Sequence, residues 1–160
     1  MSYRFRPATP ADLPLLRRWI AAPHVAEWWD AEDPCDESDL ADPSVRRWIV
    51  EPGGAPFAYA QDYDPHAEPG HHFADLPRGA RGIDQFIGEA AMTGRGHGTA
   101  FLRQRVAELF AEGAPAIGTD PHPDNARAIA VYRKVGFVAY GAPLVAPWGL
   151  VQPMVARRGA

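Results

Sequence analysis

The sequence predicts an α/β protein with one central mixed sheet and helices on its faces. From Gly82 to Val138 the pattern indicates strand, helix, strand and helix, and a strand that follows such a crossover pairs in parallel with its predecessor. Earlier, the β-rich runs VRRWIV and PFAYAQDY flank EPGGA, which is typical of an antiparallel hairpin. The length of 160 residues fits a single domain over 1–160.

The first elements follow from local signals. Tyr3–Pro7 predicts a strand. Thr9 then caps a helix, because Pro10 takes the first helical position and Asp12 follows three residues after the cap. The segment HVAEWW, residues 24–29, predicts a short second helix.

The later elements alternate between strands and helices. Residues 62–81 predict a loop of about 20 residues, a length that indicates a functional lid or a disordered segment. We then expect a strand, a helix, a strand and a helix that ends at Gly136: Gly82–Gly88, about Gly98–Glu112, Pro115–Asp120 and Pro123–Val135. GFVAYG and LVQPMVARR predict the last strands.

Charge and composition limit the partners. The net charge is −4, and residues 27–42 carry eight acids with no Lys or Arg. Such a segment repels nucleic acid and attracts a polycation, although a solubilising surface is the simpler explanation of the acids by themselves. The single Cys35 excludes an internal disulfide, and no apolar run is long enough for a membrane span. We therefore expect a cytoplasmic protein that binds neither membrane nor nucleic acid.

A glycine-rich segment opens the helix near residue 98. Gly94, Gly96 and Gly98 alternate in GRGHGTAFL, and Arg95 adds a positive charge. A helix N-terminus leaves backbone N–H groups unpaired, and glycines let an anion approach them, so a diphosphate fits this segment. Neither a Walker loop nor a dinucleotide fingerprint is present, since Thr99 stands where the latter needs glycine. A turn that only permits tight packing is the alternative.

The next helix brings two polar residues together. Asn125 precedes Tyr132 by seven residues, close to two helical turns, so both lie near one face. The Tyr132 hydroxyl could protonate a departing thiolate or donate a hydrogen bond to it.

These two segments, GRGHGTAFL and DNARAIAVYRKVGF, resemble the signature segments of the GNAT acyl-CoA-dependent N-acyltransferases. Gly96 and Gly98 occupy the family's glycine positions, and Thr93 stands where the family has Gln or Arg. HVAEWW, YAQDY, RGIDQFIG and TDPHPDNARAI extend the resemblance to the aminoglycoside 6'-N-acetyltransferases, over about Tyr3–Met154.

The resemblance implies the GNAT fold, acetyl-CoA as co-substrate and a cationic aminoglycoside as acceptor, attacked directly in a ternary complex. It assigns the coenzyme to the residues Phe86, Ile87, Arg95, Gly96, His97, Gly98, Thr99, Asn125 and Tyr132. It assigns the acceptor to Trp29, Glu68, Asp84 and Asp120. Asp84 is the expected proton acceptor and Tyr132 the expected group at the sulfur.

Two features qualify this interpretation. Where some relatives carry a Trp-Trp pair, this chain has His71-His72-Phe73, which affects the acceptor pocket. Together with His66 these histidines lack the regular spacing of a zinc site, so we expect no metal.

A siderophore-precursor or polyamine acyltransferase is the second hypothesis for the function, and a non-catalytic acyl-CoA-binding module is the third. Monomer and homodimer both remain open.

Overall fold

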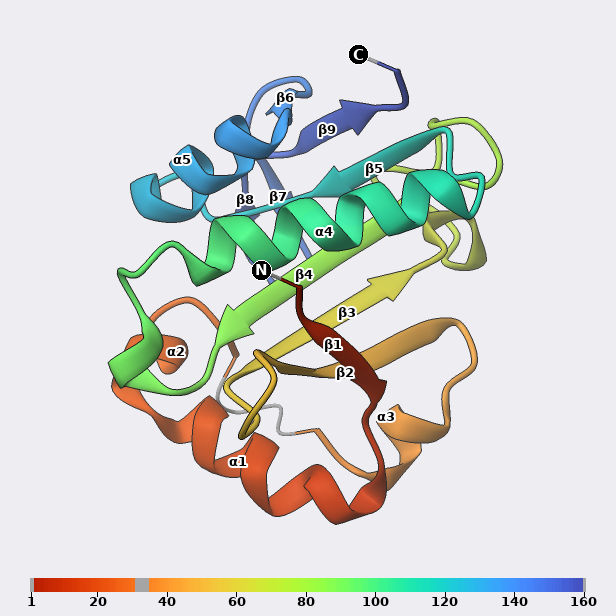
Figure 1. Ribbon diagram of the computed structural model, residues 1–160. Coiled ribbons are helices and arrows are strands. Elements are labelled where there is room, and N and C mark those ends of the chain that lie inside the picture. The colour runs from red at the N-terminus through yellow and green to blue at the C-terminus, as the bar shows by residue number, and fades with distance from the viewer. Residues whose placement is uncertain (1, 31–34, 160) are drawn as a thin grey trace.

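A seven-stranded sheet lies at the centre of the computed structural model, which describes residues 2–30 and 35–159 (Figure 1). The strand order is β1-β2-β3-β4-β5-β9-β6. The strands span Arg4–Pro7 (β1), Val45–Glu51 (β2), Ala58–Tyr63 (β3), Arg81–Ile87 (β4), Ala116–Thr119 (β5), Val138–Ala139 (β6) and Met154–Arg157 (β9). Only the pairing of β4 with β5 is parallel, so the predicted mixed sheet is confirmed.

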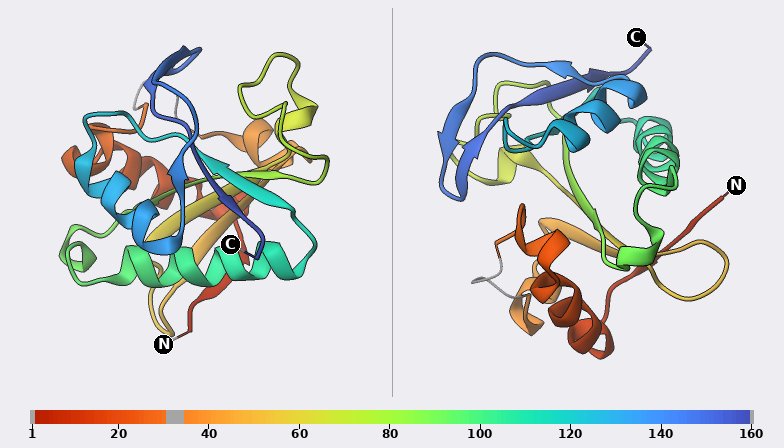
Figure 2. Two further views of the ribbon diagram at one scale, coloured as in Figure 1. Left: turned by 90° about the horizontal axis from the view of Figure 1, so that it is seen from above. Right: turned by 90° about the vertical axis from the view of Figure 1, so that its left-hand side faces the viewer.

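Helices cover both faces of this sheet. α4 (His97–Ala111) and α5 (Ala126–Val135) lie on one face, while α1 (Leu13–Ala21), α2 (Pro23–Ala26) and α3 (Glu37–Ala41) lie on the other (Figure 2). Successive side chains of β4 point to opposite faces of the sheet. Ile83 therefore packs with the core under α4 and α5, whereas Phe86 packs beside Trp19 of α1.

The observed helices correct two predicted boundaries and add one helix that was not predicted. Thr9 precedes a 3₁₀ turn, η1 (Pro10–Asp12), and α1 begins only at Leu13. The predicted 24–29 helix is shorter, since α2 ends at Ala26 and leaves both tryptophans beyond it. α3 was not predicted: the Asp36 side chain accepts hydrogen bonds from the N–H groups of Ser38 and Asp39 and starts a helix inside the acidic segment. Residues 31–34 of that segment lie outside the described residues.

The segment between β3 and β4 is shorter than the predicted loop over 62–81. Asp62 and Tyr63 belong to β3, and Arg81 belongs to β4. The connection contains a 3₁₀ turn, η2 (Pro65–Ala67), and buries Phe73 and Leu76 against the sheet. A disordered segment is therefore the wrong expectation, because these apolar side chains anchor the connection.

The C-terminal strands differ most from expectation. β9 inserts between β5 and β6 and is antiparallel to both, so β5 has no parallel neighbour on that side. The predicted strand LVQPMVARR is broken at Gln152 and Pro153, and its first part belongs to a separate hairpin. That hairpin consists of β7 (Leu144–Ala146) and β8 (Gly149–Val151), and it lies on the opposite side of the sheet from α4 (Figure 2).

A buried ionic cluster fastens the α4 face. The Asp62 carboxylate is fully buried and accepts hydrogen bonds from Arg46, Arg81 and Arg105 at 2.7–2.8 Å. The indole of Trp48 donates a further bond at 2.9 Å. These donors outweigh burial and lower the pKa of Asp62. The cluster ties β2, β3, β4 and α4 together.

Candidate active site

The parallel strands β4 and β5 separate soon after they meet. Their pairing covers only Arg81 with Ile117 and Gly82 with Gly118. β5 then ends at Thr119, directly before Asp120, while β4 continues to Ile87. The Thr119 hydroxyl donates to the Ile83 carbonyl at 3.0 Å and marks the point of separation.

The separation turns the backbone of β4 toward an open edge. Ile83 O faces Thr119, whereas Gly88 N–H faces β3 through its bond to Phe57 O at 2.8 Å. Because peptide groups alternate along a strand, those of Gln85 and Ile87 share the direction of Ile83. The imidazole of His24 forms a hydrogen bond with Ile87 O at 2.9 Å. The peptide group of Gln85, in contrast, faces the gap between the strands. An extended amide-containing ligand could pair there.

Two carboxyl groups meet at this gap. Asp84 projects from β4 and Asp120 follows the end of β5. Burial, reinforced by the negative charge of Asp120, raises the pKa of Asp84 to about 7. The amide of Gln61 donates to Asp84 Oδ2 at 3.1 Å and partly opposes that rise. A carboxyl that titrates near neutrality is suited to accept a proton from an amine.

Aromatic side chains border the acidic pair. The Trp29 ring lies 4.9 Å from that of Phe86 and 5.9 Å from that of Tyr59, centroid to centroid. All three contribute to a cavity of about 210 Å³, lined by Leu16, Ile20, Trp29, Cys35, Asp39, Arg47, Tyr59, Gln61 and Phe86. Gln61 connects this cavity to Asp84. Trp28, in contrast, is 43% exposed and packs beside His122.

Tyr132 reaches the same gap from the opposite face. Its ring is buried in the α4–α5 core, and its hydroxyl accepts a hydrogen bond from the Gln85 amide. Burial raises the pKa of Tyr132, so the hydroxyl stays protonated at neutral pH. It is therefore available as a hydrogen-bond donor at the strand separation. The side-chain oxygen of Gln85 is buried and has no hydrogen-bond partner among the described residues.

The glycine segment forms the start of α4. Gly96 is its N-cap with φ of +84°, a left-handed conformation that glycine adopts without strain. The first turn leaves backbone N–H groups free for an anion. The guanidinium of Arg127 lies beside Gly94, so a second cation joins the exposed Arg95. The Nδ1 atom of His97 contacts the Tyr3 hydroxyl at 2.8 Å, so the imidazole packs toward β1.

The structure gives Asn125 and Glu68 a less direct connection to the gap between β4 and β5 than the other predicted residues have. Asn125 is the N-cap of α5, not a residue within the helix, and its side chain accepts from Ala128 N–H at 3.2 Å. The predicted helix over 123–135 therefore starts at Ala126, and capping explains Asn125 without a ligand. Glu68 is exposed in the β3–β4 connection, and its charge acts on Tyr63 and His71.

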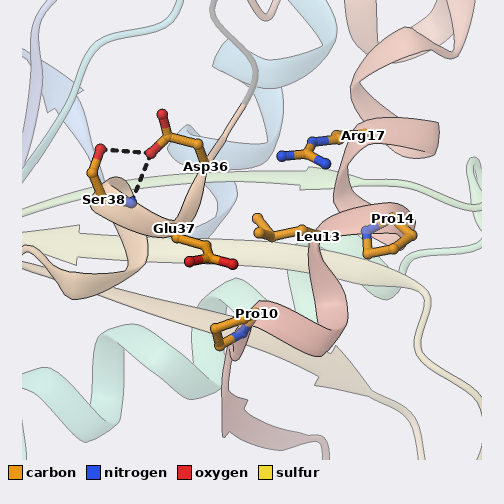
Figure 3. Close-up of a pocket in the computed structure, with 7 residues that line it drawn as sticks. All are labelled: Pro10, Leu13, Pro14, Arg17, Asp36, Glu37 and Ser38. Atoms are coloured by element: carbon orange, nitrogen blue, oxygen red, sulfur yellow. Dashed lines mark hydrogen bonds between the residues drawn. The ribbon is translucent and has the colours of Figure 1, made fainter.

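A larger surface hollow lies elsewhere. It measures about 520 Å³ between α1 and α3 and is lined by Pro10, Leu13, Pro14, Arg17, Asp36, Glu37 and Ser38 (Figure 3). Asp36 points toward Ser38 there, in the cap of α3 (Figure 3). None of the predicted site residues lines this hollow.

No helix among the described residues has the length and apolar character to cross a membrane. Within the same part of the chain, no three His, Cys, Asp or Glu side chains gather as metal ligands would.

The site residues fit an acyl-coenzyme A. The anion-binding helix start suits its pyrophosphate, and the open edge of β4 suits its amide-rich arm. Residues 8–142 match the family described as Acetyltransferase (GNAT) domain, and the chain belongs to this family.

Several relatives in this family are named as aminoglycoside acetyltransferases. The chain is 35% identical to aminoglycoside N(6')-acetyltransferase type 1 of Klebsiella pneumoniae, over 99% of this chain and 85% of that protein. It also resembles the solved structure of the aminoglycoside acetyltransferase AAC(6')-Ib with coenzyme A and kanamycin, with a TM-score of 0.87, 36% identity, and 98% and 95% of the two chains covered. A structure of AAC(6')-Ib with paromomycin and acetyl-CoA gives the same TM-score at 34% identity, with 99% and 94% covered.

Sequence reasoning missed several polar residues at the site. Gln61, Gln85 and Arg127 contact or adjoin predicted residues, and His72, noted in the sequence only as a departure from the relatives, contacts Asp120. Alternation in β4 could have indicated Gln85, since Asp84 and Gln85 must face opposite sides of one strand. The others come from a different strand, a loop and a helix, so no local pattern predicts them.

Proposed function

We propose that this protein transfers the acetyl group of acetyl-CoA to the 6'-amino group of an aminoglycoside. The observation that carries the proposal is the Asp84–Asp120 pair at the open edge of β4, bordered by Trp29 and Phe86. Carboxylates attract a polycationic amine, and aromatic faces suit its sugar rings. The names of the relatives described above point to the same substrates.

The acceptor and the coenzyme are bound on different sides of β4. On one face, Asp84 binds the ammonium group and accepts its proton, so that the neutral amine becomes the nucleophile. Asp120, Trp29 and Glu68 hold the rest of the acceptor. The ammonium group itself favours the ionised form of Asp84, because an opposite charge nearby lowers a carboxyl pKa.

The coenzyme occupies the other side of the strand separation. Backbone N–H groups of Gly96, Gly98 and Thr99 bind the pyrophosphate, with Arg95 beside them. The peptide edge from Gln85 to Ile87 aligns the pantetheine arm and polarises the thioester carbonyl. Tyr132, held by Gln85, donates its hydroxyl proton or a hydrogen bond to the sulfur that leaves.

Acetylation of kanamycin by the purified protein tests this proposal. Mass spectrometry would quantify the acetylated product and NMR would locate the acetyl group, with spermidine and N-hydroxylysine as competing acceptors. Asp84→Asn should reduce kcat by a factor of about 10² or more. Asp124→Asn is the matched control, because Asp124 is exposed on the segment that follows β5. Turnover of a control amine without turnover of any aminoglycoside would refute the proposed acceptor.

A further inference from the structure

His72 contacts the acidic pair from the β3–β4 connection. Its Nε2 atom lies 3.0 Å from Asp120 Oδ2, and the two side chains are only 12% and 6% exposed. His72 Nε2 is inaccessible to solvent and makes no standard hydrogen bond within the described residues, which leaves Asp120 as its polar contact. The imidazole thus faces the carboxyl that opposes Asp84.

The two neighbouring histidines have different tasks. His71 accepts a hydrogen bond from the Phe73 N–H at 3.0 Å, which accounts for it as a structural residue of the connection. His72 stacks on His71 at 4.3 Å, and Trp148 from the β7–β8 hairpin packs 5.9 Å from it. Within the described residues, the Nε2 atom of His72 has no such hydrogen bond. Its nearest polar group is the carboxyl of Asp120.

We propose that His72 is a positioning residue for acetyl transfer: through its ion-pair contact with Asp120 it keeps that carboxyl ionised and leaves Asp84 as the base. This inference rests on the proposed function. An imidazole nitrogen 3.0 Å from a carboxylate oxygen stabilises the anion when the ring carries its second proton, because opposite charges attract strongly at this distance. His72 therefore assigns different roles to two carboxyl groups that would otherwise compete for one proton.

The charges around this contact are defined. His71 and Glu68 belong to the same connection as His72, Asp84 projects from β4, and Tyr63 from β3 is influenced by all these acids. The β7–β8 hairpin contributes the uncharged Trp148. Among these groups His72 is the one in ion-pair contact with Asp120, so its removal should make ionisation of both carboxyl groups harder.

The test compares the pH dependence of kcat/KM in three variants. His72→Phe keeps an aromatic ring but no donor, and we expect the acidic limb to move up by about one pH unit. Activity then falls about ninefold near pH 6 and hardly at all near pH 9. The amide of His72→Gln is polar and can donate to Asp120, so it should restore part of the difference. His122→Gln is the control, since that histidine bonds to the Asp124 N–H and not to the pair.

Several outcomes would overturn the inference. A loss in His72→Phe that is equal at all pH values, or confined to KM, would show that His72 only lines the pocket. If the Phe variant does not fold, His72→Leu provides the same comparison. Carbon-13 NMR of labelled aspartate follows the Asp84 carboxyl without substrate, so it decides the inference even if aminoglycosides are not acetylated. An unchanged midpoint in His72→Phe would refute it.

Discussion

Asp120→Asn tests whether the two carboxyl groups share one charge. In the folded protein, burial and the negative charge of Asp120 raise the pKa of Asp84 to about 7. An asparagine has the same shape but no charge, and its amide could donate to Asp84. Both changes favour the ionised form, so the variant should keep Asp84 ionised at lower pH than the wild type does.

The expected size follows from the titration of one group. With a pKa of about 7, only about 3% of Asp84 is ionised near pH 5.5. If the substitution lowers that pKa by about 1.5, the ionised fraction near pH 5.5 becomes about one half. The ratio of kcat/KM near pH 5.5 to kcat/KM near pH 8 should therefore rise about fifteenfold, even if weaker acceptor binding lowers both values.

Acetylated kanamycin measured by mass spectrometry is the suitable assay, because thiol reagents respond poorly in acid. The substrate amine titrates identically with every variant, so it cancels in the comparison. Asp124→Asn controls for loss of a carboxylate in the same region. An acidic limb in Asp120→Asn that coincides with those of the wild type and this control would refute the shared charge.

Three other substitutions probe separate parts of the molecule. Asp84→Asn should raise the melting temperature near pH 8 by about 2–5 °C, because a carboxyl with a raised pKa stabilises the fold below its unfolded pKa of 3.8 and loses that contribution as pH rises through about 7; a melting temperature at or below that of the wild type in calorimetry would contradict this. Gly96→Ala forces a side chain into a left-handed conformation at the helix start, so KM for acetyl-CoA should rise about tenfold while KM for kanamycin stays unchanged; equal changes in both constants would argue against an anion site there. Asp62→Asn removes the buried carboxylate that Arg46, Arg81 and Arg105 share and leaves Arg105 with only the more exposed Glu108 and Glu112, so it should cost about 3–5 kcal/mol in the free energy of unfolding, whereas a loss below about 1 kcal/mol in urea titrations would show that the cluster is dispensable.

Local sequence signals predicted the parts of the fold that depend on neighbours in the chain. The hairpin around EPGGA and the strand at Gly82–Gly88 were confirmed because turn residues and apolar runs act over a few residues. The insertion of β9 beside β5 was not predicted, since pairing between strands far apart leaves no local pattern. α3 was missed because its start depends on one Asp36 side chain within an acidic segment.

The candidate site shows the same division. The resemblance predicted Asp84, Asp120 and Trp29, and the fold brings these residues to one face beside the strand separation. It also predicted Asn125 as a ligand residue, whereas its observed contact is the cap of α5. The contact of His72 with Asp120 joins residues nearly 50 positions apart in the sequence, so only the packed connection between β3 and β4 could indicate it.

Asp62 and Asp84 lie on adjacent strands, with Asp62 opposite Ile83, yet their side chains leave the sheet on opposite faces. Arg105, Trp48 and Arg81 lower the pKa of Asp62 on the α4 face, whereas burial and a second acid raise that of Asp84 on the other face. The backbone of the sheet therefore separates Asp62, whose pKa is lowered, from Asp84, whose pKa is raised. Acceptor specificity can consequently diverge on one face of β3 and β4 while the stability of the fold is maintained from the other.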